Sequence, residues 1–189
     1  MTARLIYVVG ASGSGKDTLM GHARQKLASD PRVCFAHRYI TRPAAAGGEN
    51  HVALTTEEFT ARQNGKLFAM HWSSHGLQYG IGIEINQWLG KGITVVINGS
   101  REYLDEARQR YPELLPVTID VATEVLRDRL LARGREDAES IEQRLRRHEK
   151  LRLQPLPGVL IQNNGPIEVA GEALVRLIAE HTQGASVCV

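Results

Sequence analysis

Short apolar runs recur along the chain, and segments with the apolar spacing of helices lie between or after them. The runs span residues 5–9, 93–97, 115–119 and 159–161. Helical patterns span residues 17–27, 100–110, 122–132, 138–151 and 166–181, and Thr55 with Glu58 resembles a capping box that starts another helix. Strands that alternate with helices form parallel sheets covered on both faces. The pattern therefore predicts an α/β fold with three layers, α/β/α, around a parallel central sheet.

One motif follows the first predicted strand, in the segment VVGASGSGKDT at residues 8–18. Its Gly10, Gly15 and Lys16 fit the phosphate-binding P-loop, in which backbone N–H groups and the next helix N-terminus bind an anion. Lys16 is expected to contact the outer phosphates of ATP and to act in catalysis. The residues expected to bind ATP here are Gly10, Ala11, Ser12, Gly13, Ser14, Gly15, Lys16, Asp17 and Thr18. The alternative is an ordinary glycine-rich turn, which the strand, loop and helix context disfavours.

Asp17 stands where a P-loop usually has a hydroxyl residue that binds magnesium. A carboxylate there complements the helix dipole, which stabilises a helix by roughly 0.3 to 1 kcal/mol. Beside a triphosphate it is repulsive, unless a divalent cation is coordinated by oxygens of both. The apolar run ITVVI also ends in Asn98, where a Walker-B-like strand would end in Asp. We therefore expect Asp17 to be an Mg²⁺ ligand, directly or through water, with ATP as the co-substrate.

Two regions interrupt the alternation of strands and helices. Residues 38–82 are rich in glycine, histidine and aromatic residues and show only weak strand patterning, and residues 132–140 form a polar, arginine-bearing link. In an enzyme that transfers phosphate, these regions would be the acceptor-binding insert and the lid. We expect one domain, residues 1–189, with a core at 1–37, 83–131 and 152–189, an insert at about 38–82 and a lid at about 132–151.

Composition excludes several classes of protein. The 189 residues suffice for one domain with its own core, and no segment approaches the roughly 18 apolar residues that span a membrane. A net charge of +2 does not indicate nucleic-acid binding. The apolar N-terminal run resembles a buried strand more than a signal peptide, and Cys34 and Cys188 lie in no metal-binding spacing. We therefore expect a cytoplasmic protein whose partners include neither membrane nor nucleic acid.

Beyond the P-loop, the order of motifs resembles that of guanylate kinases over nearly the whole chain. The matching segments are YITRP with Arg42, EEF at residues 57–59, QYG with Tyr79, and RLLARGREDAESIEQRL with Arg133, Arg135 and Arg144. The resemblance implies a P-loop NTPase fold of the nucleoside-monophosphate-kinase type. It implies that Arg42 and Tyr79 hold the acceptor's phosphate, that Arg133 and Arg135 contact ATP, and that Arg133 and Arg144 act in catalysis. Arginine suits these tasks because its planar fork binds phosphate oxygens bidentately.

The chain departs from the guanylate kinase pattern at the positions that bind the purine base. Guanylate kinases read it with an acid in FLE and a hydroxyl in YG[ST], and the corresponding places here are Ala69 and Ile81. The chain resembles ribose 1,5-bisphosphate phosphokinases, which are guanylate-kinase-like enzymes of phosphonate catabolism. The segments that carry this resemblance are GSGKD, HRYITRPAAAGGENHVAL, QYGIGIE and VINGSR. The resemblance implies ATP-dependent phosphorylation of ribose 1,5-bisphosphate to 5-phosphoribosyl 1-diphosphate.

Such an acceptor has two phosphates and no base, so its site needs cations at both ends and partners for hydroxyl groups between them. The residues expected to bind it are Arg38, Arg42, Glu49, His51, Tyr79, Asn98 and Arg101. A structural role remains the alternative for His51, and an ordinary packed aromatic for Tyr79. Two other functions stay open, a nucleoside monophosphate kinase and a non-catalytic guanylate-kinase-like interaction module. The oligomeric state, a homodimer included, also stays open.

Overall fold

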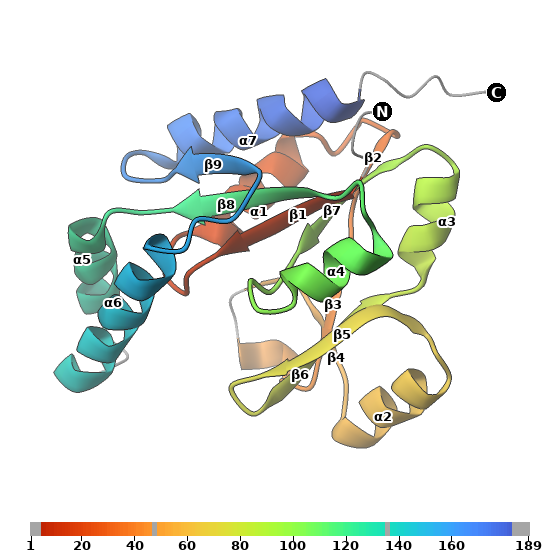
Figure 1. Ribbon diagram of the computed structural model, residues 1–189, viewed down its shortest axis with the longest axis horizontal. Helices are drawn as coiled ribbons and strands as arrows, with labels where there is room; N and C mark the ends of the chain where they lie inside the picture. The colour runs from red at the N-terminus through yellow and green to blue at the C-terminus, as the bar shows by residue number, and fades with distance from the viewer. Residues whose placement is uncertain (1–4, 47–48, 135–136, 183–189) are drawn as a thin grey trace.

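The computed structural model describes residues 5–46, 49–134 and 137–182. Its central sheet has five strands, and every neighbouring pair in it is parallel. In order across the sheet, the strands are β2 (Val33–Phe35), β7 (Thr94–Asn98), β1 (Leu5–Gly10), β8 (Leu115–Asp120) and β9 (Val159–Gln162). The predicted parallel sheet is confirmed, and the four apolar runs of the sequence are β1, β7, β8 and β9 (Figure 1).

Helices cover both faces of this sheet. The first face is covered by α1 (Lys16–Lys26) and α7 (Ile167–Thr182), and the second by α3 (Glu84–Gly90) and α4 (Leu104–Arg110). Successive side chains of a strand point to opposite faces, so β1 buries Ile6 and Val8 on the first face and Tyr7 and Val9 on the second. In Figure 1, α7 lies above the sheet, α4 lies below it and α3 lies beside its right-hand end. The sheet and the helices on its two faces are the three predicted layers.

A second, four-stranded sheet lies below the central one in Figure 1. Its elements are β3 (Arg38–Ile40), a 3₁₀ turn η1 (Ala44–Ala46), β4 (Val52–Ala53), α2 (Thr56–Asn64), β5 (Phe68–Ser74) and β6 (Leu77–Gly82). The sequence indicated only weak strand patterning here, because β3 and β4 have three and two residues, too few to show an alternation. The predicted capping box is confirmed at the start of α2, where Thr55 and Glu58 bond reciprocally.

Two further helices, α5 (Thr123–Arg133) and α6 (Ala138–Arg152), project from the C-terminal end of β8 (Figure 1). They share a small apolar core of their own that includes Leu126, Leu130, Ile141 and Leu145. This pair contains most of the segment that the sequence predicts to be a lid. Within the part of the chain that the structure describes, no helix has the length and apolarity required to cross a membrane.

The fourth helix begins later than the sequence pattern indicated. The pattern predicted a helix from residue 100, but α4 starts at Leu104. Gly99 and Ser100 instead lie against Tyr7, whose hydroxyl donates to the Ser100 carbonyl at 2.8 Å and accepts from its N–H at 3.0 Å. A Cβ on Gly99 would lie 2.1 Å from the Tyr7 ring, so only glycine permits this approach.

Candidate active site

The P-loop connects β1 to α1, and its two frame glycines are required by the geometry. Gly15 has φ +86°, a left-handed conformation that favours glycine. A Cβ at Gly15 would lie 2.4 Å from Nδ2 of Asn163, and one at Gly10 would lie 2.8 Å from the carbonyl oxygen of Ile119. The loop is therefore packed from behind as well as turned sharply. This is the arrangement in which successive N–H groups at a helix N-terminus can bind phosphate.

Asn163 and Arg129 support the P-loop from behind, and the sequence did not single out either residue. Nδ2 of Asn163 donates to the carbonyl of Ser14 at 2.7 Å, and Arg129 donates to the carbonyl of Asn163 at 2.9 Å. In a planar trans peptide the C=O and the following N–H point in opposite directions. Anchoring the Ser14 carbonyl therefore fixes the N–H of Gly15 on the opposite side of that peptide, away from Asn163.

Lys16 and Asp17 meet at the end of β7. Nζ of Lys16 donates to Oδ1 of Asn98 at 2.5 Å and lies 3.3 Å from Oδ1 of Asp17, which also accepts from Nδ2 of Asn98 at 2.9 Å. Burial lowers the pKa of Lys16 to about 8, although the charge of Asp17 opposes this shift. Burial alone would raise the pKa of Asp17, but the charges of Lys16 and Arg38 outweigh it and leave that pKa lowered.

Asn98 also joins the P-loop to the second sheet. Its Nδ2 donates to Oε2 of Glu49 at 3.2 Å, and Glu49 forms a bidentate ion pair with Arg38, with Nε to Oε1 at 2.8 Å. The Arg38 guanidinium lies over the Tyr79 ring, 5.0 Å from its centroid. Burial lowers the pKa of Arg38 to about 10, so the group is still charged at neutral pH. Four of the predicted acceptor residues, Arg38, Glu49, Tyr79 and Asn98, are thus connected.

Arg42 and His51 extend this group of residues. Both ring nitrogens of His51 face main-chain carbonyls, Nδ1 that of Glu49 at 3.1 Å and Nε2 that of Arg42 at 3.1 Å, so His51 holds these two segments together. One guanidinium nitrogen of Arg42 lies 3.4 Å from Nδ1 of His51. Nε of Arg42 is buried and has no hydrogen-bond partner among the described residues. A buried N–H without a partner costs free energy, so an anion bound there would relieve that cost.

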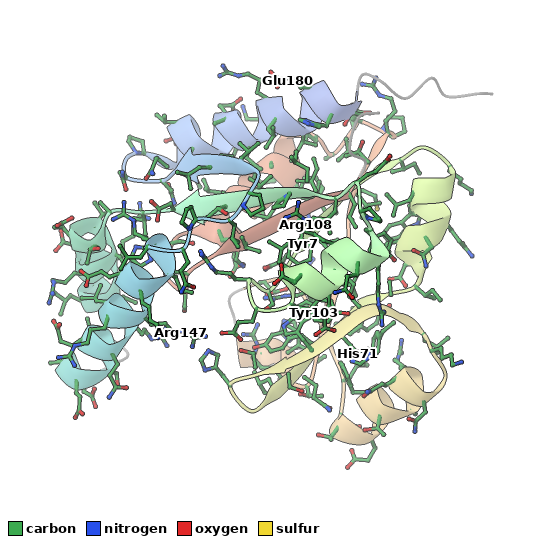
Figure 2. All side chains as sticks on the ribbon, viewed as in Figure 1. Tyr7, His71, Tyr103, Arg108, Arg147 and Glu180 are labelled. Atoms are coloured by element: carbon green, nitrogen blue, oxygen red, sulfur yellow. The ribbon has the colours of Figure 1, made fainter. Side chains whose placement is uncertain are left out.

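An aromatic stack and an apolar pair lie on the same face of the second sheet. Trp72 stacks on Tyr79, with ring centroids 5.7 Å apart, and on Tyr103, with centroids 5.5 Å apart; Figure 2 shows Tyr103 between α4 and β5. Ile81 pairs across the strands with Met70, and neither is exposed at all. Ala69 and Ile81 were expected at the positions where guanylate kinases read guanine, and a register shift between Phe68 and Met70 places Met70, the neighbour of Ala69, opposite Ile81. Ala69, Met70 and Ile81 are all apolar and buried, so none of them supplies the acid or the hydroxyl that reads guanine.

Comparisons with known proteins show the family of the chain. No protein-family model matches the chain. The ribose 1,5-bisphosphate phosphokinase PhnN of Thiobacillus denitrificans is 56% identical over 182 residues, which cover 94% of this chain and 93% of the relative. The ribose 1,5-bisphosphate phosphokinase PhnN of Desulfomicrobium baculatum is 56% identical over 180 residues, which cover 95% of this chain and 96% of the relative.

The chain belongs to the ribose 1,5-bisphosphate phosphokinase family. Its fold is that of a solved guanylate kinase from Anaplasma phagocytophilum, with a TM-score of 0.69 at 16% identity over 96% of this chain and 87% of the other. The predicted guanylate-kinase-like P-loop fold is confirmed. As a family member the protein is a kinase, and the remaining predicted residues can be placed against that activity.

The arginines predicted for the lid and the sugar site have different surroundings. Arg144 of α6 donates to Oγ of Ser12 at 2.6 Å, which connects the predicted lid to the P-loop. Arg101 donates to the carbonyls of Leu151 at 2.8 Å and of Gln154, at the end of α6, and not to the residues around Asn98. Arg135 and the side chain of Arg133 lie outside the described residues. The roles of all four arginines stay predictions.

The surroundings of Asp17 suit a hard cation. Asn98 donates to both Asp17 and Glu49, so two carboxylates lie within reach of one amide nitrogen. The side chain of Asp17 is about half exposed, 46%. No cluster of three or more His, Cys, Asp or Glu side chains suited to a metal occurs in the described parts of the chain. Mg²⁺ is commonly held by one or two carboxylates together with substrate phosphates, so the residues present fit it.

Proposed function

We propose that this kinase transfers the γ-phosphoryl group of ATP to the 1-phosphate of ribose 1,5-bisphosphate, which yields 5-phosphoribosyl 1-diphosphate and ADP. The observation that carries the proposal is the hydrogen-bonded connection through Asn98, from Lys16 in the P-loop to Glu49 and Arg38 in the second sheet. It brings a phosphate-binding loop and an arginine-rich acceptor surface to one place. The named activity of relatives that are 56% identical supports the same reaction.

The chemistry requires positioning and neutralisation of charge more than proton transfer. The attacking oxygen belongs to a phosphate that is already ionised, so no general base is required. Lys16 would neutralise charge on the outer phosphates of ATP, and Arg144, which contacts the P-loop through Ser12, would do so from α6. We assign Mg²⁺ to Asp17, directly or through water, with Glu49 nearby. Bound there, the ion would neutralise part of the charge of the phosphates.

The acceptor would lie on the face of the second sheet that carries Arg38 and Tyr79. Arg38 and Arg42 supply the cations for its phosphates, and the Glu49 carboxylate can accept hydrogen bonds from ribose hydroxyls. Glu49 now neutralises Arg38, so a bound phosphate would share or replace this ion pair. Nucleotides are the alternative acceptors, but the buried pair of Met70 and Ile81 offers no polar partner to a purine edge.

The decisive experiment compares kcat/KM for ribose 1,5-bisphosphate and GMP at equal ATP and magnesium. Each buried polar group without a partner costs roughly 1 to 3 kcal/mol, so two of them should suppress GMP by about two to four orders of magnitude. The product of the ribose reaction is identified by its consumption in a phosphoribosyltransferase assay. Comparable values, or a preference for GMP, would leave a nucleoside monophosphate kinase.

A non-catalytic interaction module is the alternative from another class. Calorimetry with ATP separates the two, since a module without P-loop chemistry would not bind it. We place the reaction in the cytoplasm, where ATP is abundant and the free thiol of Cys34 stays reduced.

A further inference from the structure

A cleft lies on the face of the second sheet that is opposite the predicted acceptor site. On this face Phe68 packs against Phe59 of α2, with ring centroids 4.6 Å apart, and His71 lies next to Phe68 at 6.5 Å. Trp72, the next residue of β5, points to the other face and stacks on Tyr79. The cleft has a volume of about 590 Å³ and is bounded by α2, β5, α3 and the end of α4. Figure 2 labels His71 on the part of the sheet away from Arg147 of α6.

The lining of this cleft is basic. Lys66, His71 and Arg110 line it, and no aspartate or glutamate is among the described residues that do. Nη1 of Arg110 donates to the carbonyl of Ala69 at 2.7 Å, which fixes the guanidinium against β5. The Tyr111 hydroxyl donates to Oδ1 of Asn86 at 2.6 Å, so the Asn86 amide is oriented and its NH₂ group can still donate. Oriented donors with one sign of charge favour an anionic ligand.

Lys66 occupies a backbone position that favours glycine. It follows α2 with φ +56° in a Schellman motif, in which Leu67 N donates to the Arg62 carbonyl at 2.9 Å and Lys66 N to that of Gln63 at 3.0 Å. Gly65, one residue earlier, has φ −74° and needs no such freedom. A lysine in a left-handed conformation is strained, although its charge complements the helix C-terminus. A ligand-binding role for the ammonium group would explain why a lysine occupies this strained position.

We propose that this cleft binds a phosphate monoester of the size of a mononucleotide. The phosphate is held by Lys66, His71 and Arg110, and the organic part lies against Phe68 and Ile83, where the amides of Gln63 and Asn86 meet its polar edge. About 590 Å³ is far more than inorganic phosphate fills and lies within the usual range for small-molecule sites. The cleft shares no residue with the connection through Asn98, so the inference goes beyond the proposed function.

The cleft is coupled to the acceptor face through one strand. His71 and Trp72 are neighbours on β5, and Trp72 is the ring on which Tyr79 stacks. A ligand that draws His71 toward the cleft therefore acts on the strand that positions Tyr79. We expect the monoester to change the KM for the phosphoryl acceptor more than it changes the KM for ATP.

The test titrates three probes, AMP, ribose 5-phosphate and inorganic phosphate, into protein saturated with magnesium and a non-hydrolysable ATP analogue. We expect AMP to bind about tenfold or more tighter than inorganic phosphate, because its base and ribose use the rest of the cleft. Lys66→Gly should weaken AMP about tenfold or more, because a charge-assisted contact is lost. Lys66→Arg should restore most of the affinity. Lys91→Gly, which removes an exposed lysine that does not line the cleft, should leave the affinity unchanged.

A loss of AMP affinity in Lys66→Gly would not be due to unfolding, because glycine suits the backbone conformation of residue 66. The Tm of Lys66→Gly should therefore not fall. Equal AMP affinity in wild type and Lys66→Gly would place the ligand elsewhere and overturn the proposal. Absence of AMP binding at millimolar concentration, or equal affinity for AMP and inorganic phosphate, would overturn it too. If ribose 5-phosphate binds more tightly than AMP, the ligand is a sugar phosphate and not a mononucleotide. That result would overturn the ligand size proposed.

Discussion

The P-loop and the second sheet, the two regions proposed to bind phosphate, are built in different ways. In the P-loop the main-chain N–H groups are the expected phosphate ligands. Their positions are fixed because Gly15 has a left-handed φ and the Ser14 carbonyl accepts a hydrogen bond from Asn163. In the second sheet charged side chains neutralise one another, and Arg38 is paired with Glu49. The proposed ATP end is therefore already formed in the ligand-free protein, whereas at the proposed acceptor end the Arg38–Glu49 pair would have to exchange partners when a phosphate binds. Asn98 contacts both ends, so each of the following predictions tests whether they act separately.

The largest effect is expected for Lys16→Met. Losing the cation that faces the outer phosphates should lower kcat/KM by at least about 10³-fold. The fold should persist, because the buried ammonium has a pKa lowered to about 8 and does not stabilise the ligand-free protein at neutral pH. ADP release and thermal unfolding followed by circular dichroism measure the two quantities. Turnover at the wild-type rate by the folded variant would remove Lys16 from the active site.

A smaller loss, confined to one substrate, is expected for Arg42→Ala. The penalty in acceptor binding should be about 2 kcal/mol or more if a buried charged contact is lost, while the Kd of ATP stays the same. Calorimetry with each substrate tests this, with Arg108→Ala as the control because Arg108 is exposed on α4. Equal weakening of ATP and acceptor would mean that the two ends are not separate.

The sequence allowed the P-loop and the parallel sheet to be predicted, because both follow local rules. The glycine spacing specifies a backbone conformation, and short segments rich in apolar residues mark four of the five central strands. The second sheet could not be predicted as a sheet, since a strand such as β4 has two residues and depends on its neighbours. The short elements β2 and α3 were not predicted either. The start of α4 was placed too early, because the segment before Leu104 depends on the distant Tyr7 side chain.

The candidate site was predictable only in part, for similar reasons. Motif order placed Arg42 and Tyr79 at the acceptor face, and their grouping with Asn98 appears only in the fold. Asn163 was missed because its partner is the carbonyl of Ser14, far away in the sequence, and no residue pattern specifies such a contact. The charge of Arg101 suggested a phosphate ligand, and that role stays a prediction. Its guanidinium donates to the Leu151 carbonyl at the end of α6, a contact that no sequence pattern specifies.

Asp17→Asn tests the metal side of the comparison. The amide cannot replace the charge of a carboxylate, so half-maximal activity should require about tenfold more magnesium. The ATP Kd measured without magnesium should change less, since the backbone of the loop is unaltered. A magnesium titration of ADP release gives the result, and Asp137→Asn, at the start of α6, serves as the control for loss of a helix-terminal charge. An unchanged titration with a lower Tm would favour the helix-dipole explanation.

The smallest effect concerns pH and again separates the two ends. The pKa of Lys16 is lowered to about 8 in the ligand-free protein, so above pH 8 the ammonium that faces the phosphates is progressively lost. The Kd of ATP should therefore rise above pH 8, by at most about tenfold per pH unit. Between about pH 8 and 10 the unfolded chain holds this proton and the folded protein does not, so the stability of the ligand-free protein should rise with pH. Lys16→Arg should flatten both curves, because arginine stays charged, and the acceptor's Kd, set by Arg38 and Arg42, should show neither trend. An ATP Kd that is constant from pH 7 to 9.5 in wild type, measured by calorimetry, would contradict a lowered pKa at Lys16.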